Sequence, residues 1–143
     1  MRVLLLLAAV LAAAPAAVPS ASAQVGLGGL IGDPTGLTVK LGGGRGGVAV
    51  DVGLSNDLFV QAHYLIRETR LRGAGADLRF LFGPGGFFQN SDPEVAAGVS
   101  ALVGLSVYIA PEFELFGQLT PGIVLTPDVT DNVGVAVGLR FYP

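Results

Sequence analysis

The feature that most constrains this chain is a strict two-residue alternation of side-chain type close to its C-terminal end. One set of alternate positions is entirely apolar: Val133, Val135, Val137, Leu139 and Phe141. The positions between them hold small or polar residues: Gly134, Ala136, Gly138, Arg140 and Tyr142. Because successive side chains of a β-strand point to opposite faces, this pattern predicts a strand over 133–142 with one continuously apolar face.

The same alternation recurs along the chain after residue 23. It predicts seven further strands, at roughly 24–31, 36–42, 47–54, 57–67, 70–82, 96–109 and 113–125. Segments rich in Gly, Pro, Asn and Asp, which are the residues that tight turns require, separate most of them: Asp33–Gly36, Gly42–Gly46, Ser55–Asp57, Gly83–Gly86, Ala110–Glu112 and Asp128–Asn132. A weaker turn is predicted near Glu68 and Thr69. Pro121 indicates either a bulge or an earlier end of the strand 113–125, because proline cannot donate to a central ladder.

These segments predict an all-β protein, an eight-stranded antiparallel up-and-down β-barrel. Short turns make consecutive strands antiparallel neighbours, and an even number of strands can close on itself and remove the exposed edges. No 3.6-residue helical pattern follows residue 23. We expect residues 24–143 to form a single β-barrel domain.

Residues 1–23 have the pattern of a cleaved signal peptide. Arg2 gives a positive start, 3–14 is an apolar run, and Ala21 and Ala23 supply the small residues of a cleavage site. The alternative is a transmembrane anchor, but the apolar run is shorter than the roughly 20 residues that span a bilayer. We therefore expect an exported protein that is cleaved after Ala23.

Composition excludes several kinds of site. Of the 8 basic and 11 acidic residues only Arg2 lies before residue 24, which leaves a mild acidic excess and no basic patch, so we expect no nucleic-acid partner. The chain has no cysteine, which excludes a disulfide scaffold, a cysteine-ligated metal and a lipid-modified N-terminal cysteine. Charged residues are 13% of the chain, about half the usual share of a soluble protein, so an unusually apolar surface is expected.

The less apolar faces of the strands carry a nearly charge-balanced polar set: Lys40, Asp51, Gln61, His63, Arg67, Asp77, Arg79, Glu114, Gln118 and Arg140. In a membrane barrel the apolar faces point outward to lipid and the polar faces line the lumen. The interior of an eight-stranded barrel is just wide enough for side chains to fill, and opposite charges there would pair. We expect these residues to form a polar network in the lumen. The alternative is a soluble barrel with the faces reversed and an apolar cavity for a ligand.

Two stretches resemble an uncharacterised bacterial family of small outer-membrane β-barrel proteins. The first runs from Gly26 through Asp33-Pro34-Thr35-Gly36 to Lys40 and resembles the opening hairpin of the family. The second resembles its last three strands and comprises Val103–Ser106, Glu112–Phe116, Thr120–Gly122 and Gly138–Tyr142. The family is similar in architecture to the OmpA membrane domain, whose lumen is filled by a salt-bridge network. The resemblance implies a barrel in the bacterial outer membrane, in contact with lipid and with the barrel-assembly machinery, but it implies no activity.

Two features bear on this assignment. Outer-membrane barrels usually end on an aromatic residue, whereas this chain ends Phe141-Tyr142-Pro143 and contains no tryptophan, so its aromatic girdle is thin. With the N-terminus on the periplasmic side, the longest predicted connector, Gly83 to Glu94, is an outer loop. That loop holds Phe87 and Phe88, which we expect to fold over the barrel mouth or to contact lipid or a partner.

No motif predicts catalysis, a cofactor or a metal. His63 is the single histidine, and a metal site would need a second histidine or a carboxylate cluster. Ser100 and Ser106 have no base at motif spacing, and Asp77 and Glu114 are expected to be counter-ions rather than an acid–base pair. We therefore expect an outer-membrane barrel with a structural or interaction role and no catalysis. The alternatives are a soluble periplasmic barrel that binds a small hydrophobic ligand, and a barrel enzyme acting on lipids or peptides.

Overall fold

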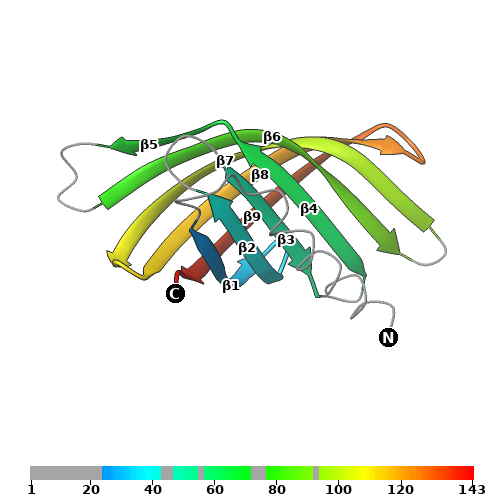
Figure 1. Ribbon diagram of the computed structural model, residues 1–143. Coiled ribbons are helices and arrows are strands. Elements are labelled where there is room, and N and C mark those ends of the chain that lie inside the picture. The colour runs from blue at the N-terminus through cyan, green and yellow to red at the C-terminus, as the bar shows by residue number, and fades with distance from the viewer. Residues whose placement is uncertain (1–23, 43–46, 55–56, 72–76, 92–93) are drawn as a thin grey trace.

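A computed structural model describes residues 24–42, 47–54, 57–71, 77–91 and 94–143, so the expected signal peptide lies outside the described residues. Nine antiparallel strands make up almost all of this part (Figure 1): β1 Val25–Gly32, β2 Gly36–Gly42, β3 Gly47–Gly53, β4 Leu58–Leu65, β5 Arg67–Leu71, β6 Asp77–Ser91, β7 Glu94–Ala110, β8 Phe113–Thr126 and β9 Thr130–Phe141. No helix that could cross a membrane occurs among the residues described.

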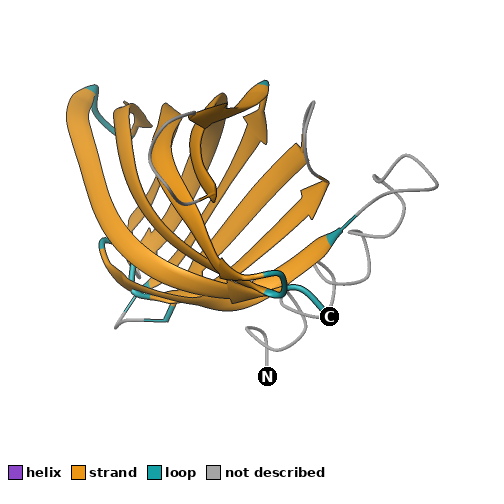
Figure 2. Cartoon of the chain, turned by 90° about the vertical axis from the view of Figure 1, so that its left-hand side faces the viewer, coloured by secondary structure: helices purple, strands orange, loops and turns teal. Residues whose placement is uncertain are grey.

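The strands form one closed sheet. Apart from β4 and β5, which both pair with β6, each strand pairs with the next along the chain, and β9 returns to pair with β1. Only Ile66 separates β4 from β5, so the two are successive parts of one wall strand. The protein is therefore an eight-stranded, closed, all-antiparallel barrel, as the alternation predicted, and the strands curve around an enclosed interior (Figure 2).

The strands are staggered as well as paired. One circuit of paired residues runs through Gly28, Thr38, Asp51, Gln61, Phe87, Gly98, Val124 and Thr130. Thr130 lies ten residues before Arg140, the β9 residue that pairs with Gly28, so a circuit advances by ten residues. This stagger tilts the strands by about 40° to the barrel axis. Residues far apart in sequence number therefore meet at one level of the interior.

The fourth and fifth predicted strands differ from the observed ones. The segment 70–82 is not one strand, because β5 ends at Leu71 and β6 begins at Asp77. Glu68 and Thr69, predicted as a turn, lie within β5. The predicted turn Gly83–Gly86 and the predicted loop to Glu94 are also wrong, because β6 continues through them to Ser91.

A bulge explains why Gly83–Gly86 resembles a turn. His63 pairs with Gly85, but Arg67 pairs with Phe82, so the register shifts by one residue between them. Pro84 lies opposite this interruption of the ladder, where its missing N–H is tolerated. A Cβ on Gly83 would collide with the backbone carbonyl of Tyr64, so the close approach of the two strands requires glycine there.

Pro121 does not end its strand. β8 continues to Thr126, and Pro121 pairs with Val133 of β9. On its other side, the ladder to β7 passes from Ser100–Gly122 to Val103–Leu119 without a pair at Pro121. The proline thus occupies a gap in one ladder, as its chemistry demands.

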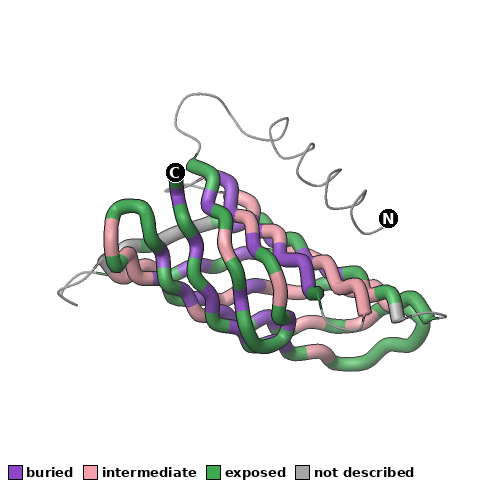
Figure 3. Tube along the Cα trace, turned by 90° about the horizontal axis from the view of Figure 1, so that it is seen from below, coloured by how far each residue is buried: buried purple, intermediate pink, exposed green. Residues whose placement is uncertain are grey.

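The polar faces of the strands point inward and the apolar faces point outward. Exposed and buried residues alternate along β8 and β9, as the colours of the tube show (Figure 3). Val135 and Val137 are more than half exposed, whereas the Arg140 side chain on the other face is 1% exposed. The barrel therefore has charged side chains inside and many large apolar side chains outside, the reverse of the arrangement in a water-soluble protein.

Large inward side chains fit because glycines lie beneath them. The Phe116 ring lies over Gly138, where a Cβ would come within 2.5 Å of it. Rings also lie over glycines at Tyr142 and Gly26, Phe87 and Gly98, and His63 and Gly85. The inward glycines thus provide the space that the interior rings occupy in a narrow barrel.

Candidate functional site in the barrel interior

The interior holds most of the residues predicted to form a polar network. Seven of the ten are buried there: Lys40, Asp51, Gln61, His63, Glu114, Gln118 and Arg140. Arg79 is half-buried, with its guanidinium 4.6 Å from the centre of the Tyr108 ring. The side chains of Arg67 and Asp77 lie outside the described part of the structure. The backbone of Arg67 pairs with Phe82 of β6.

The first group, the Glu114 cluster, consists of Thr38, Lys40, Glu114, Arg140 and Tyr142 and lies at the end of the barrel where β1 begins and β9 ends. The Arg140 guanidinium donates to Glu114 Oε1 at 2.9 Å, and the Lys40 ammonium donates to Oε2 at 3.3 Å. Tyr142 donates its hydroxyl proton to Oε1 at 3.1 Å. One buried carboxylate therefore has two cationic partners and a third donor.

Arg140 joins this cluster to other parts of the wall. Its Nε and one terminal nitrogen donate to Thr38 Oγ1 at 3.2 and 3.0 Å, reaching from β9 past β1 to β2. Its guanidinium also lies 3.7 Å from the centre of the Phe116 ring. A planar cation with five donors suits such a position, because it satisfies several strands at once.

The second group, the Asp51 cluster, consists of Asp51, Gln61 and Gln118. Both amides donate to Asp51 Oδ2 at 2.8 Å. Gln118 is on β8 and Asp51 on β3, and these strands are four apart on either path around the eight-stranded barrel. The bond between them therefore crosses the lumen from one wall to the opposite wall, so side chains close the interior at this level.

A third contact lies closer to the far end of the barrel, where β6 ends and β7 begins. His63 Nε2 and Ser100 Oγ are 2.8 Å apart. His63 Nδ1 and Asp51 Oδ1, both buried, have no hydrogen-bond partner among the described residues. The hydroxyl of Ser106 has none either, but Ser106 pairs with Phe116 and lies closer to the Glu114 cluster. The part of the interior around His63 and Asp51 is thus incompletely satisfied, in contrast to the Glu114 cluster.

Phe87 and Phe88 do not form an outer-loop contact site. Both lie in β6, where Phe87 is 7% exposed inside the barrel and stacks on Phe59 at 5.9 Å between ring centres. Phe88, the next residue, faces outward and is 41% exposed. The connections at the far end are short, so the structure has no long loop in this region to carry such a site.

The predicted polar network left out several interior residues: Thr38, and Ser100, Phe116 and Tyr142, which the alternation had placed on the less apolar faces. Thr38 and Lys40 share an alternation phase, as do Tyr142 and Arg140, so phase alone could have included them. Their pairing could not be foreseen, because it depends on the stagger and on contacts across the lumen.

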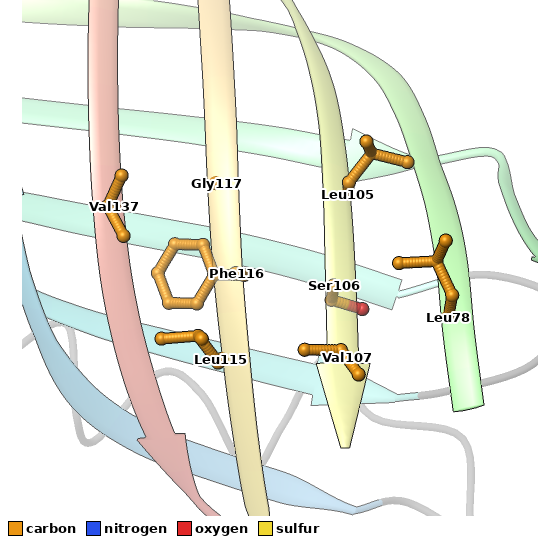
Figure 4. A pocket seen from close by; sticks show the side chains of 8 residues that line it. All are labelled: Leu78, Leu105, Ser106, Val107, Leu115, Phe116, Gly117 and Val137. Atoms are coloured by element: carbon orange, nitrogen blue, oxygen red, sulfur yellow. The ribbon is translucent and has the colours of Figure 1, made fainter. Parts of the chain in front are cut away.

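The outer wall carries a shallow apolar hollow of about 200 Å³ centred on Gly117 (Figure 4). Leucine and valine side chains surround it, from four neighbouring strands: Leu78, Leu105, Val107, Leu115 and Val137. A Cβ on Gly117 would meet nothing within 4 Å. Ser106 is the one polar residue of the lining, and its side chain is buried.

The described residues offer little to a metal. Nowhere in the described ranges do three or more His, Asp or Glu side chains gather as potential ligands. The chemistry available inside the barrel is therefore that of paired charges, amides, one imidazole and hydroxyl groups.

No protein-family model matches this chain, and no curated protein and no solved structure matches it either. The resemblance of its two ends to small outer-membrane barrels therefore stays a prediction.

Proposed function

We propose that this protein is a small integral barrel of the bacterial outer membrane, with a structural or interaction role and a lumen filled by side chains. The main support for the proposal is that the barrel has buried charged side chains inside and exposed apolar side chains outside. Lys40, Asp51, Glu114 and Arg140 are at most 1% exposed, while large apolar side chains such as Ile109 and Val133 are more than half exposed. Lipid is the solvent for which such a surface is suited.

The outer faces of β7 and β8, two long neighbouring strands, support this proposal most strongly. The outward positions of β7 and β8 contain no charged or amide side chain: Val95, Ala97, Val99, Ala101, Val103, Leu105, Val107 and Ile109, then Phe113, Leu115, Gly117, Leu119, Pro121, Ile123 and Leu125. At 3.3 Å per residue and a tilt of about 40°, this surface covers about 35 Å along the barrel axis. The apolar band of a membrane barrel needs only about 25 Å.

Outward aromatic residues gather mainly at one end. Phe80, Phe82, Phe113 and Phe141 lie near the end where β9 finishes, and Phe113 packs against Phe141 with 5.2 Å between ring centres. Phe88 is the outward phenylalanine near the other end. An aromatic group at this end is consistent with one membrane interface, where aromatic girdles are found.

The filled lumen supports a structural rather than a transport role. The Gln118–Asp51 bond crosses the interior, and Phe116 and Leu102 are at most 2% exposed. Eight-stranded barrels have little interior space beyond that taken by side chains. The soluble alternative requires apolar faces around a cavity, and its ligand would have to fit an interior already occupied by ion pairs.

The test is fractionation of cells that express the full chain, followed by gel electrophoresis of the membrane pellet with and without boiling. We expect the protein in the outer-membrane fraction and a mobility shift on heating. A protein found free in the periplasmic fraction contradicts the proposal.

A matched pair of variants sharpens this test. Leu119 is 42% exposed at an outward position near the middle of β8. Leu119→Arg should reduce the folded protein recovered from membranes, because an outward arginine near the midplane costs about 2–4 kcal/mol. Leu119→Val serves as the control. Equal recovery of the arginine and valine variants would contradict a lipid-facing wall.

A further inference from the structure

A serine, a histidine and an aspartate from three strands lie in the incompletely satisfied part of the interior. Ser100 of β7 is partly exposed, and its Oγ is 2.8 Å from Nε2 of His63 on β4. His63 and Asp51 are 1% and 0% exposed, and each keeps one polar atom without a partner, Nδ1 and Oδ1. Buried polar atoms without partners are rare and point to a function or to a missing ligand.

The two unpartnered atoms are chemically complementary. When Nε2 accepts the hydroxyl proton of Ser100, Nδ1 carries the proton of the neutral imidazole and needs an acceptor. Asp51 Oδ1 is such an acceptor. Asp51 pairs with Gln61, two residues from His63 on the same face of β4, so Asp51 and His63 are diagonal neighbours with Cα atoms about 7–8 Å apart. A water that bridges Nδ1 and Oδ1 would satisfy both atoms.

We propose that Ser100 is an activated nucleophile, with His63 as its base and Asp51 as the residue that positions the imidazole. This arrangement follows the general logic of a hydroxyl activated by an oriented base, which is recognised by geometry rather than by position in the sequence. The inference goes beyond the structural role proposed above and does not depend on where the barrel resides.

The reaction that the site would support is acyl transfer from an ester. Ser100 Oγ forms a bond to the carbonyl carbon while its proton passes to His63 Nε2. The ester C–O bond then breaks, and the proton leaves with the alcohol. Attack by water through the same base releases the acid and restores the hydroxyl of Ser100.

The surroundings of the site favour a slender apolar acyl group. The His63 ring lies over Gly85, and a Cβ on Gly122 would come within 2.8 Å of Ser100 Cβ, so both neighbouring strands approach the site closely. Phe87 pairs with Gly98, two residues before Ser100, and stacks on Phe59. An acyl chain that enters from the end where β6 meets β7 would pass these two rings.

The experiment is covalent labelling of the full chain, folded in detergent, with diisopropyl fluorophosphate. In this reaction Ser100 Oγ forms a bond to phosphorus, fluoride leaves, and the proton passes to His63. Ser106 provides an internal comparison, because it lies on the same strand and face, its hydroxyl has no partner, and it lies beside no imidazole. Peptide mapping should show Ser100 labelled at least about 100-fold faster than Ser106, the size of a general-base effect.

Three variants separate activation from packing, with heat-modifiable migration on gels as the folding control. We expect His63→Gln to reduce labelling of Ser100 about 100-fold or more. Asp51→Asn should reduce it about tenfold, and Asp51→Glu should restore part of the rate, which a purely structural role would not predict. Absence of labelling at Ser100, equal rates at Ser100 and Ser106, or an unchanged rate in a folded His63→Gln protein overturns the inference. Because Ser106 is 1% exposed and Ser100 is partly exposed, the variants at His63 and Asp51 are needed to separate activation from access. Absence of labelling at Ser100 in the unaltered protein overturns the inference even if the substitutions prevent folding.

Discussion

The two buried carboxylates of the interior, Glu114 and Asp51, differ in their hydrogen-bond partners. Glu114 accepts hydrogen bonds from Lys40, Arg140 and Tyr142, and both of its oxygens are used. Asp51 accepts hydrogen bonds from two neutral amides, both on Oδ2, while Oδ1 has no partner among the described residues. Both side chains are fully buried. Burial alone therefore does not reveal what a buried acid does.

The difference separates a part of the interior in which every carboxylate oxygen is paired from a part in which polar atoms lack partners among the described residues. The Glu114 cluster joins β2, β8 and β9 and satisfies its charges completely, so it resists change. The Asp51 cluster joins opposite walls through amides and leaves an acceptor beside a histidine. The contrast between the two clusters should appear in the stability of variants, measured as the midpoint of urea unfolding in detergent micelles.

Replacing Glu114 with glutamine should have the largest effect. The substitution preserves shape but removes the negative charge that Lys40 and Arg140 both contact in the buried interior. Removal of one partner from a buried ion pair costs about 3–5 kcal/mol. A Glu114→Gln protein with an unchanged unfolding midpoint would show that the cluster contributes little to stability.

Replacing Arg140 with leucine should cost somewhat less, about 2–4 kcal/mol. Glu114 would keep Lys40 and Tyr142, while Thr38 would lose its guanidinium donors. The unfolding midpoint should fall, though less than in Glu114→Gln. Equal stability of Arg140→Leu and the unaltered protein would indicate that Arg140 does not lie in the interior.

The glycine beneath Phe116 provides a packing test of the same region. A Cβ on Gly138 would come within 2.5 Å of the Phe116 ring and of a β1 carbonyl, so Gly138→Ala should destabilise the barrel by about 1–3 kcal/mol. Gly117→Ala is the matched control, because that position faces outward into open space. Similar unfolding curves for the two variants would contradict the packing of rings over glycines.

Replacing Asp51 with asparagine should have the smallest effect, within about 1 kcal/mol. The asparagine oxygen can still accept from Gln61 and Gln118, and no cation is paired with Asp51 in the described structure. A loss as large as that of Glu114→Gln would remove the contrast between the two clusters.

The sequence predicted best those features that depend only on neighbouring residues within one strand. β2 begins and ends where the alternation placed it, β3 ends one residue earlier than predicted, and β1 is shifted by one residue at both ends. Alternation fixes which residues share a face, so it also placed Lys40, Asp51 and Arg140 on one side of the wall.

What failed or stayed hidden depends on neighbouring strands. Gly83–Gly86 has the composition of a turn, yet it continues β6 because the bulge between β4 and β5 accommodates the proline. The Gln118–Asp51 and His63–Ser100 contacts arise from the ten-residue stagger around the barrel, which no single segment encodes.

The central claim is that the apolar outer faces of the strands contact lipid, and its most direct test is a fluorescence measurement on β9 in lipid vesicles. The chain has no cysteine, so single cysteines at the outward positions Val135 and Val137, and at the exposed Asp128 in the turn before β9, can each carry an environment-sensitive dye without entering the packed interior. Lipids that carry a quencher on their acyl chains should quench the dye strongly at Val135 and Val137 and weakly at Asp128. Quenching that is absent, or equal at all three positions, would contradict the assignment of the apolar faces to lipid.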